Sequence, residues 1–183
     1  MKTKHAGNVS ETEIELKKGP VYRFLADDHA RLDLLLQRAF ADSESIDLQA
    51  YSEFRSGLLK HIAMEEKVLL PAAQQARDGE SLPIAAKLRI QHGALAALLV
   101  PSPTCAIGAA LRAILKVHNP LEEGSGGVYE VCERLADSEA GTMLAKLQSY
   151  AEIKLAAHND GPLVMESTRR ALTRAGYNLE DYI

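Results

Sequence analysis

Two segments of the chain carry a histidine followed four residues later by a glutamate. The first is HIAMEE, with His61 and Glu65, and the second is HNPLEE, with His118 and Glu122. Residues four apart lie on the same face of an α-helix, and here that face also carries apolar side chains. Burying an ionised carboxylate costs several kcal/mol unless it is paired or bound to a cation. The two segments therefore favour a bound metal over an ordinary apolar core.

Two further histidines lie on apolar stripes of other predicted helices, His29 in HARL and His92 in HGAL. A single core-facing histidine is more often bonded to a carbonyl than to a metal, but four predicted helices with one such histidine each favour a shared site. Four imidazoles and two carboxylates form an N/O ligand set that suits iron, manganese, zinc or copper. The predicted metal ligands are His29, His61, Glu65, His92, His118 and Glu122.

Other polar residues near these positions have weaker claims to a metal. Glu66 and Glu123 follow the predicted glutamate ligands directly, a rotation of about 100° on a helix, so they are predicted to be solvated or to support the site from outside. Asp28 is either a surface charge, the preferred interpretation, or a partner that orients an imidazole. His158 lies at the predicted end of a helix, where a surface role is favoured.

These residues need helices to position them, and the hydrophobic periodicity is helical from residue 19 almost to the end. We predict an all-α fold, an up-down-up-down antiparallel four-helix bundle with one or two additional C-terminal helices. The predicted parts are a flexible arm over residues 1–18, the bundle over residues 19–136 and the extension over residues 137–183, packed on the bundle. The helices are expected at residues 20–41, 47–77 with a bend at Pro71, 83–100, and 104–136 with an interruption at Pro120 and GSGG, followed by helices at 141–158 and 161–177.

The composition narrows the classes of partner. The net charge of −4, the pI near 5.9 and the 5% of aromatic residues favour neither nucleic acid nor a membrane surface. The longest apolar run, ALAALLV, is too short to cross a bilayer, and the first residues lack the apolar core of a signal peptide, so a cytoplasmic location is expected. Cys105 and Cys132 have no CxxC spacing and are predicted to be reduced thiols that pack in the core.

The order H…HxxxE…H…HxxxE resembles the haemerythrin-like family, also called the HHE cation-binding domain, over roughly residues 20–136. The resemblance implies a bundle around two iron ions linked by an oxo or hydroxo bridge, with zinc or manganese as alternatives. It implies that Glu65 and Glu122 bridge the metals and that the four histidines are terminal ligands.

The chain departs from the family pattern at two places. Oxygen-carrying members have a further histidine four residues after the third, and here that position is Ala96. Either the site stays more open than in a carrier, or another residue fills the gap; the candidates are His158, Tyr22, Tyr51 and Tyr129. Pro120 removes a backbone hydrogen bond between His118 and Glu122, which makes Glu123 an alternative to Glu122.

Three functions are consistent with this sequence. The preferred one is a di-iron protein that binds O2, peroxide or nitric oxide as a sensor, scavenger or store. The second is a redox enzyme on the same scaffold, which reduces peroxide or donates iron for repair. The third is an interaction module, stapled by zinc or metal-free, that contacts a protein partner or a second copy of the chain through its C-terminal helices.

Overall fold

The computed structural model describes residues 18–42 and 44–183, and within these residues it contains helices and no strand. This confirms the predicted all-α class for the described part of the chain. Most of the predicted arm lies outside the described residues, and the boundary at residue 136 stays a prediction. The α-helices are α2 (Pro20–Ala39), α3 (Leu48–Met64), α4 (Leu70–Gln75), α5 (Ala85–Leu98), α6 (Cys105–Glu123), α7 (Val128–Ala136), α8 (Ala140–Gln148) and α9 (Pro162–Arg174). A π-helix, η1 (Glu65–Leu69), and two 3-10 helices, η2 (Asp137–Glu139) and η3 (Leu179–Tyr182), complete the set.

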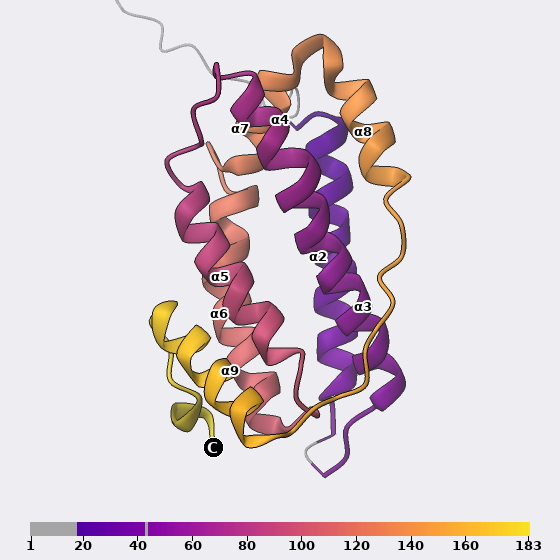
Figure 1. Cartoon of the computed structure of the whole chain (residues 1–183). Helices are drawn as coiled ribbons and strands as arrows, with labels where there is room; N and C mark the ends of the chain where they lie inside the picture. The colour runs from indigo at the N-terminus through magenta and orange to yellow at the C-terminus, as the bar shows by residue number, and fades with distance from the viewer. Residues whose placement is uncertain (1–17, 43) are drawn as a thin grey trace, which may run out of the picture.

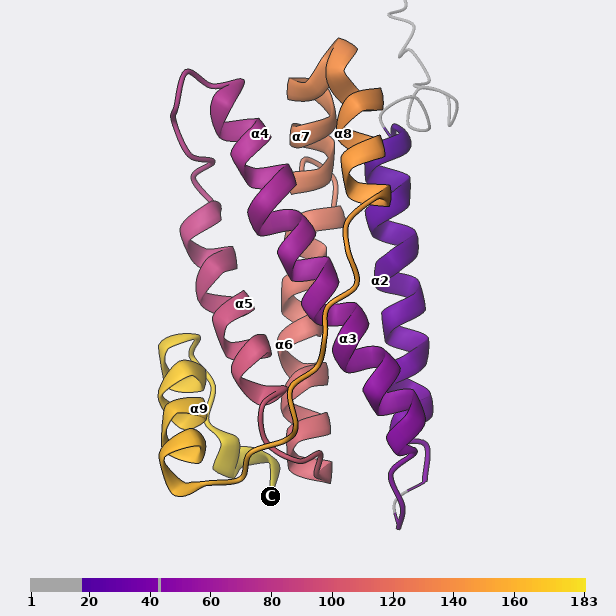
Figure 2. The same cartoon turned by 45° about the vertical axis from the view of Figure 1, so that its right-hand side comes forward.

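The long helices lie side by side along the length of the molecule (Figures 1 and 2). The chain turns back after α2, after α4 and after α5 (Figures 1 and 2). Among the long helices, α2 packs against α3, and α5 packs against α6. Helix starts follow local chemistry: Pro20 begins α2, and the side chains of Asp47 and Thr104 cap α3 and α6 by accepting hydrogen bonds from backbone N–H groups three residues on. None of the described helices combines the length and hydropathy needed to cross a bilayer.

The helix that carries His61 changes geometry immediately after it. The backbone N–H of Leu70 donates to the carbonyl of Glu65, five residues earlier, so η1 is a π turn between α3 and α4. Pro71 follows this turn, and a proline has no N–H for the carbonyl four residues earlier and collides with it in regular α geometry. The sequence predicted a bend at Pro71, and the structure instead accommodates this proline with a π turn immediately before it.

Residues 149–161, here called the strap, connect α8 to α9 as an extended segment along α3 (Figures 1 and 2). The prediction of a helix over residues 141–158 is therefore wrong beyond Gln148. Tertiary hydrogen bonds replace helical ones: the Arg55 side chain donates to the carbonyl of Ala156 at 2.8 Å, and the N–H of Asn159 donates to the carbonyl of Val100 at 3.1 Å. Backbone groups paired in this way need no helix.

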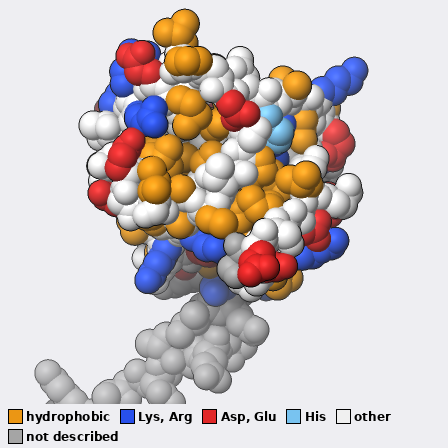
Figure 3. All heavy atoms as spheres, turned by 90° about the horizontal axis from the view of Figure 1, so that it is seen from below, with side chains coloured by type: hydrophobic (Ala, Val, Ile, Leu, Met, Phe, Trp, Pro, Cys, Tyr) orange, Lys and Arg blue, Asp and Glu red, His pale blue; other side chains and the backbone are white. Residues whose placement is uncertain are grey.

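The remaining C-terminal elements pack on different sides of the bundle. Helix α8 lies beside α2 and η1, whereas α9 lies on α5 and η3 lies on α6. Figure 3 views the end of the molecule near α9, where hydrophobic side chains are interspersed with acidic and basic ones. This face therefore carries no field of a single sign.

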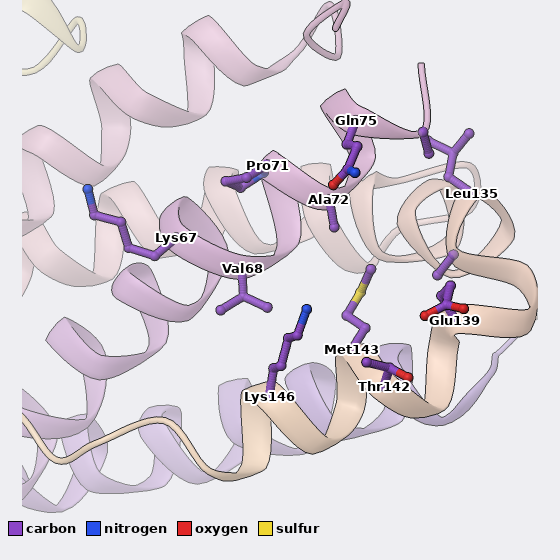
Figure 4. Close-up of a pocket in the computed structure, with 12 residues that line it drawn as sticks. Lys67, Val68, Pro71, Ala72, Gln75, Leu135, Glu139, Thr142, Met143 and Lys146 are labelled. Atoms are coloured by element: carbon purple, nitrogen blue, oxygen red, sulfur yellow. The ribbon is translucent and has the colours of Figure 1, made fainter. Parts of the chain in front are cut away.

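A surface pocket of about 580 Å³ lies between η1, α4, α7 and α8 (Figure 4). Apolar side chains such as Val68, Ala72 and Met143 line it, together with Lys67 and Lys146. None of the six predicted metal ligands belongs to this pocket, so it is separate from the candidate site.

Buried apolar side chains form two clusters with the candidate site between them. On α2, Leu25 belongs to one cluster and Leu32 to the other, and His29 lies between these two leucines in the sequence. On α3, His61 likewise lies between Leu58 of one cluster and Met64 of the other. The bundle thus brings its buried polar residues to the same height along its axis, with an apolar cluster on either side.

Candidate metal centre

All six predicted ligands are buried, with exposed fractions of only 1% to 5%. They fall into two groups of four that share both glutamates, and the potential ligand atoms within each group lie within 4.8 Å of one another. The groups are His29, His61, Glu65 and Glu122, and Glu65, His92, His118 and Glu122. Two overlapping sets with shared carboxylates suit two neighbouring cations better than one.

The two carboxylates contact histidines of both groups. Oε1 of Glu65 lies 3.3 Å from Nε2 of His61, and Oε2 lies 3.3 Å from Nε2 of His92. Oε2 of Glu122 lies 3.1 Å from Nε2 of His118 and 3.5 Å from Nε2 of His29. All four histidines therefore direct Nε2 to the interior, where a carboxylate reaches across from one group to the other.

Three histidines are oriented from behind by a hydrogen bond at the other ring nitrogen. Nδ1 of His61 lies 2.8 Å from Oδ2 of Asp28, and Nδ1 of His92 lies 2.8 Å from Oε1 of Glu66. When an acceptor binds the Nδ1–H group, Nε2 presents its lone pair to the site, which is how metal-binding histidines are commonly held. The preferred surface interpretation of Asp28 is therefore wrong, and the orienting interpretation describes it.

The corresponding partner of His118 is Gln91, whose Oε1 lies 3.0 Å from Nδ1 of the imidazole. Sequence reasoning missed this residue. The pair is 27 residues apart on two different helices, so no helical spacing connects them. The adjacency of Gln91 to His92 was the only local signal.

The carboxylates of the cluster favour protonated, positively charged imidazoles. Burial disfavours the charged imidazolium, but the carboxylates of Glu65 and Asp28 outweigh it and raise the pKa of His61 to about 10. Burial opposes charge at His92 as well, and Glu122 and Glu65 raise its pKa to about 10. The surroundings therefore favour positive charge at the positions where a cation is expected.

Two buried polar atoms of the site lack hydrogen-bond partners. They are Oε2 of Glu65, which lies 3.3 Å from Nε2 of His92 without making a hydrogen bond to it, and Nδ1 of His29. Burial and the nearby Glu65 carboxylate both act to raise the pKa of Glu122. The hydrogen bonds from His118 and His92 outweigh them, so the pKa lies below its usual value. A divalent cation relieves the repulsion between the carboxylates and gives the unpaired Glu65 oxygen a partner, so the donor set fits a metal.

Pro120 does not bring Glu123 into the site in place of Glu122. Helix α6 continues through the proline to Glu123, which keeps Glu122 one turn after His118. Glu122 is 1% exposed within the cluster, whereas the Glu123 side chain is 34% exposed and its Oε2 lies 3.8 Å from Nδ1 of His29. The structure thus places Glu122, rather than the alternative Glu123, among the six.

Of the four residues considered for the gap at Ala96, only Tyr129 lies inside the site. Its hydroxyl donates to Oε1 of Glu65 at 2.7 Å. Burial and the carboxylates of Glu65 and Glu122 hold the pKa of Tyr129 well above its usual value, so the metal-free phenol keeps its proton. The other three lie elsewhere: His158 bonds to the carbonyl of Pro101, Tyr22 bonds to the carbonyl of Glu123, and Tyr51 belongs to an apolar cluster.

Both cysteines are free thiols, as predicted, but only one packs in the core. Cys132 is buried, which raises the pKa of its thiol to about 12, and Cys105 is exposed at the start of α6. The prediction of two core thiols is therefore wrong for Cys105, because a first-turn residue has no preceding turn to cover it.

Residues 21–100 match the family described as the hemerythrin HHE cation binding domain, which confirms the resemblance over this range. The matched range contains His29, His61, Glu65 and His92. Helix α6, with His118 and Glu122, lies beyond it, and the structure brings these two residues to the same cluster. No match was found among curated proteins or among solved structures.

Proposed function

From the premise that residues 21–100 match an HHE cation-binding domain, we propose that this chain is a non-haem di-iron protein. In the proposed function, an antiparallel four-helix bundle binds O2, peroxide or nitric oxide as a sensor, scavenger or store. The observation that carries the proposal is the pair of four-residue groups that share Glu65 and Glu122. A single cation would leave two of the four buried histidines without a role.

The donor set assigns roles to the residues. His29 and His61 would hold one cation, His92 and His118 the other, and the two glutamates would contact both. Iron supplies the redox couple and the exchangeable coordination positions that these small ligands require. Zinc and manganese suit the same donors, so metal analysis has to accompany every functional test.

The surrounding residues of the chain keep this site ordered and dry. Asp28, Glu66 and Gln91 hold three imidazoles with Nε2 directed inward, so the donors are arranged before a metal binds. The apolar clusters above and below the site limit the access of water. Exclusion of water protects a reactive small ligand from side reactions, which suits binding or storage.

The test is anaerobic purification of the iron-supplied protein, followed by metal analysis and visible spectroscopy before and after addition of O2, peroxide or nitric oxide. We expect two irons per chain and new absorption bands with at least one of these ligands. A colourless, iron-free chain, or stoichiometric zinc despite available iron, would contradict the proposal.

Peroxide turnover separates binding from catalysis. We expect a binding protein to consume peroxide, per bound iron, no faster than its Glu65→Ala variant. A wild-type rate well above that of the variant would instead support the redox enzyme.

A further inference from the structure

Tyr129 places a phenol at the centre of the candidate site. The residue lies in the first turn of α7, just after the glycine-containing break that ends α6, and it is completely buried. The carboxylate of Glu130 accepts a hydrogen bond from the N–H of Gly126 at 2.8 Å and fixes this break. The tyrosine ring packs edge-on against Tyr22, with ring centroids 6.0 Å apart. These contacts hold the ring in one position.

The hydroxyl oxygen contacts every member of one donor group. It lies 2.7 Å from Oε1 of Glu65, 3.1 Å from Nε2 of His61, 3.2 Å from Nε2 of His29 and 3.4 Å from Oε2 of Glu122. In an octahedral site with bonds of about 2.1 Å, neighbouring donor atoms lie about 3.0 Å apart. The oxygen therefore has the spacing of a fifth donor next to the other four.

We propose that Tyr129 is a ligand, and that its phenolate oxygen binds the cation held by His29 and His61. The inference rests on the proposed two-metal function. When the oxygen binds, its O–H bond breaks, the proton leaves to solvent, and an oxygen lone pair forms the bond to the cation. No electron is transferred in this step.

The tyrosine makes the two halves of the site unequal. The half with His29 and His61 has five protein donors, while the half with His92 and His118 has four among the described residues. Ala96, one helical turn after His92, adds no donor to the second half. O2, peroxide or nitric oxide would therefore bind at the second half, where fewer protein donors would leave more coordination positions exchangeable.

Resonance Raman spectroscopy of the ferric protein tests this ligand. We expect vibrations of an iron-bound phenolate in the wild type, which shift when the protein is grown with ring-deuterated tyrosine. Tyr129→Phe should lose them completely. Tyr22→Phe is the matched control, because it also removes one tyrosine hydroxyl. That hydroxyl bonds to the backbone carbonyl of Glu123 and not to the donor group, so this variant should keep the phenolate vibrations.

The outcomes separate this inference from the proposed function. A wild type with two irons and no phenolate vibrations overturns the tyrosine ligand and leaves the di-iron proposal standing. A wild type that binds no iron overturns the di-iron proposal itself. The labelled wild-type spectrum decides the question even if Tyr129→Phe does not fold.

Discussion

The two glutamates at the end of α6 are adjacent in the sequence, but they contact different histidine nitrogens. Glu122 lies against Nε2 of His118 and His29, whereas Glu123 reaches only the outer ring nitrogen of His29, at 3.8 Å. A rotation of about 100° between successive helical residues explains the difference. The carboxylate that can contact both proposed cations is therefore Glu122.

Replacing these neighbours separates the two environments. We expect Glu122→Ala to bind at most one iron per chain, because it removes a donor from both groups at once. Glu123→Ala is the matched control and should retain two irons, since its side chain is outside the donor set. Metal analysis after anaerobic loading provides the comparison, and equal iron contents would contradict the assignment.

Asp28 acts on the site through His61. Its carboxylate lies 2.8 Å from Nδ1 of this imidazole, which orients Nε2 toward the other donors. We expect Asp28→Ala to lower iron affinity by about 10- to 100-fold, the usual effect of losing such an outer partner. Competition with a ferrous chelator measures the change. Asp33→Ala, on the exposed side of the same helix, should leave affinity unaltered, and an equal loss there would refute the orienting role.

At the scale of elements, the strap depends on a buried arginine. Arg55 is 6% exposed, and its side chain donates to the carbonyl of Leu99 at 2.7 Å and to that of Ala156 at 2.8 Å. It thus connects α3 to the end of α5 and to the strap. A second contact, between the Ser102 backbone N–H and the Asp160 side chain at 2.7 Å, holds the far end of the strap.

We expect Arg55→Met to lower the free energy of unfolding by about 1–3 kcal/mol. The methionine leaves the buried carbonyl of Leu99 without a donor, and an unsatisfied buried group costs about 1–3 kcal/mol. Ala156 is exposed, so water replaces the lost donor at its carbonyl. Urea unfolding measures the loss, and limited proteolysis should show new cleavage within residues 149–161. Arg38→Met, at an exposed ion pair, should change stability by about 0.5 kcal/mol or less. An uncleaved strap with unchanged stability would show that Arg55 does not retain it.

At the scale of the whole molecule, the candidate site joins all the long helices. Its donors come from α2, from α3 and η1, from α5 and from α6, and two apolar clusters pack on either side. A cation bound there would contact the folded chain at points that separate on unfolding. Metal binding would therefore be coupled to global stability.

We expect ferrous iron at 100 times its dissociation constant to raise the free energy of unfolding by about 2.7 kcal/mol for each independent site. Anaerobic urea unfolding with and without iron measures the gain, and a chelator should reverse it. Glu122→Ala should show a much smaller gain. Identical unfolding curves for iron-loaded and iron-free wild type would mean that the metal binds outside the bundle.

The sequence by itself determined the features that depend on local spacing. A histidine and a glutamate four residues apart share a helix face wherever the helix lies, so His61 with Glu65 and His118 with Glu122 were predictable as pairs. The apolar stripes around His29 and His92 indicated burial for the same reason. Helix starts at Pro20 and after Thr104 were also local, because capping involves residues within one turn.

Only the tertiary structure decided which distant groups meet. Gln91 behind His118, Tyr129 among the donors and Arg55 beneath the strap each involve residues from different elements. Periodicity indicates which face of a helix is buried, but it does not set the height or rotation of one helix against another. The strap was mispredicted as a helix because its backbone groups pair with Arg55 and with the carbonyl of Val100. Such pairing exists only after the bundle has formed.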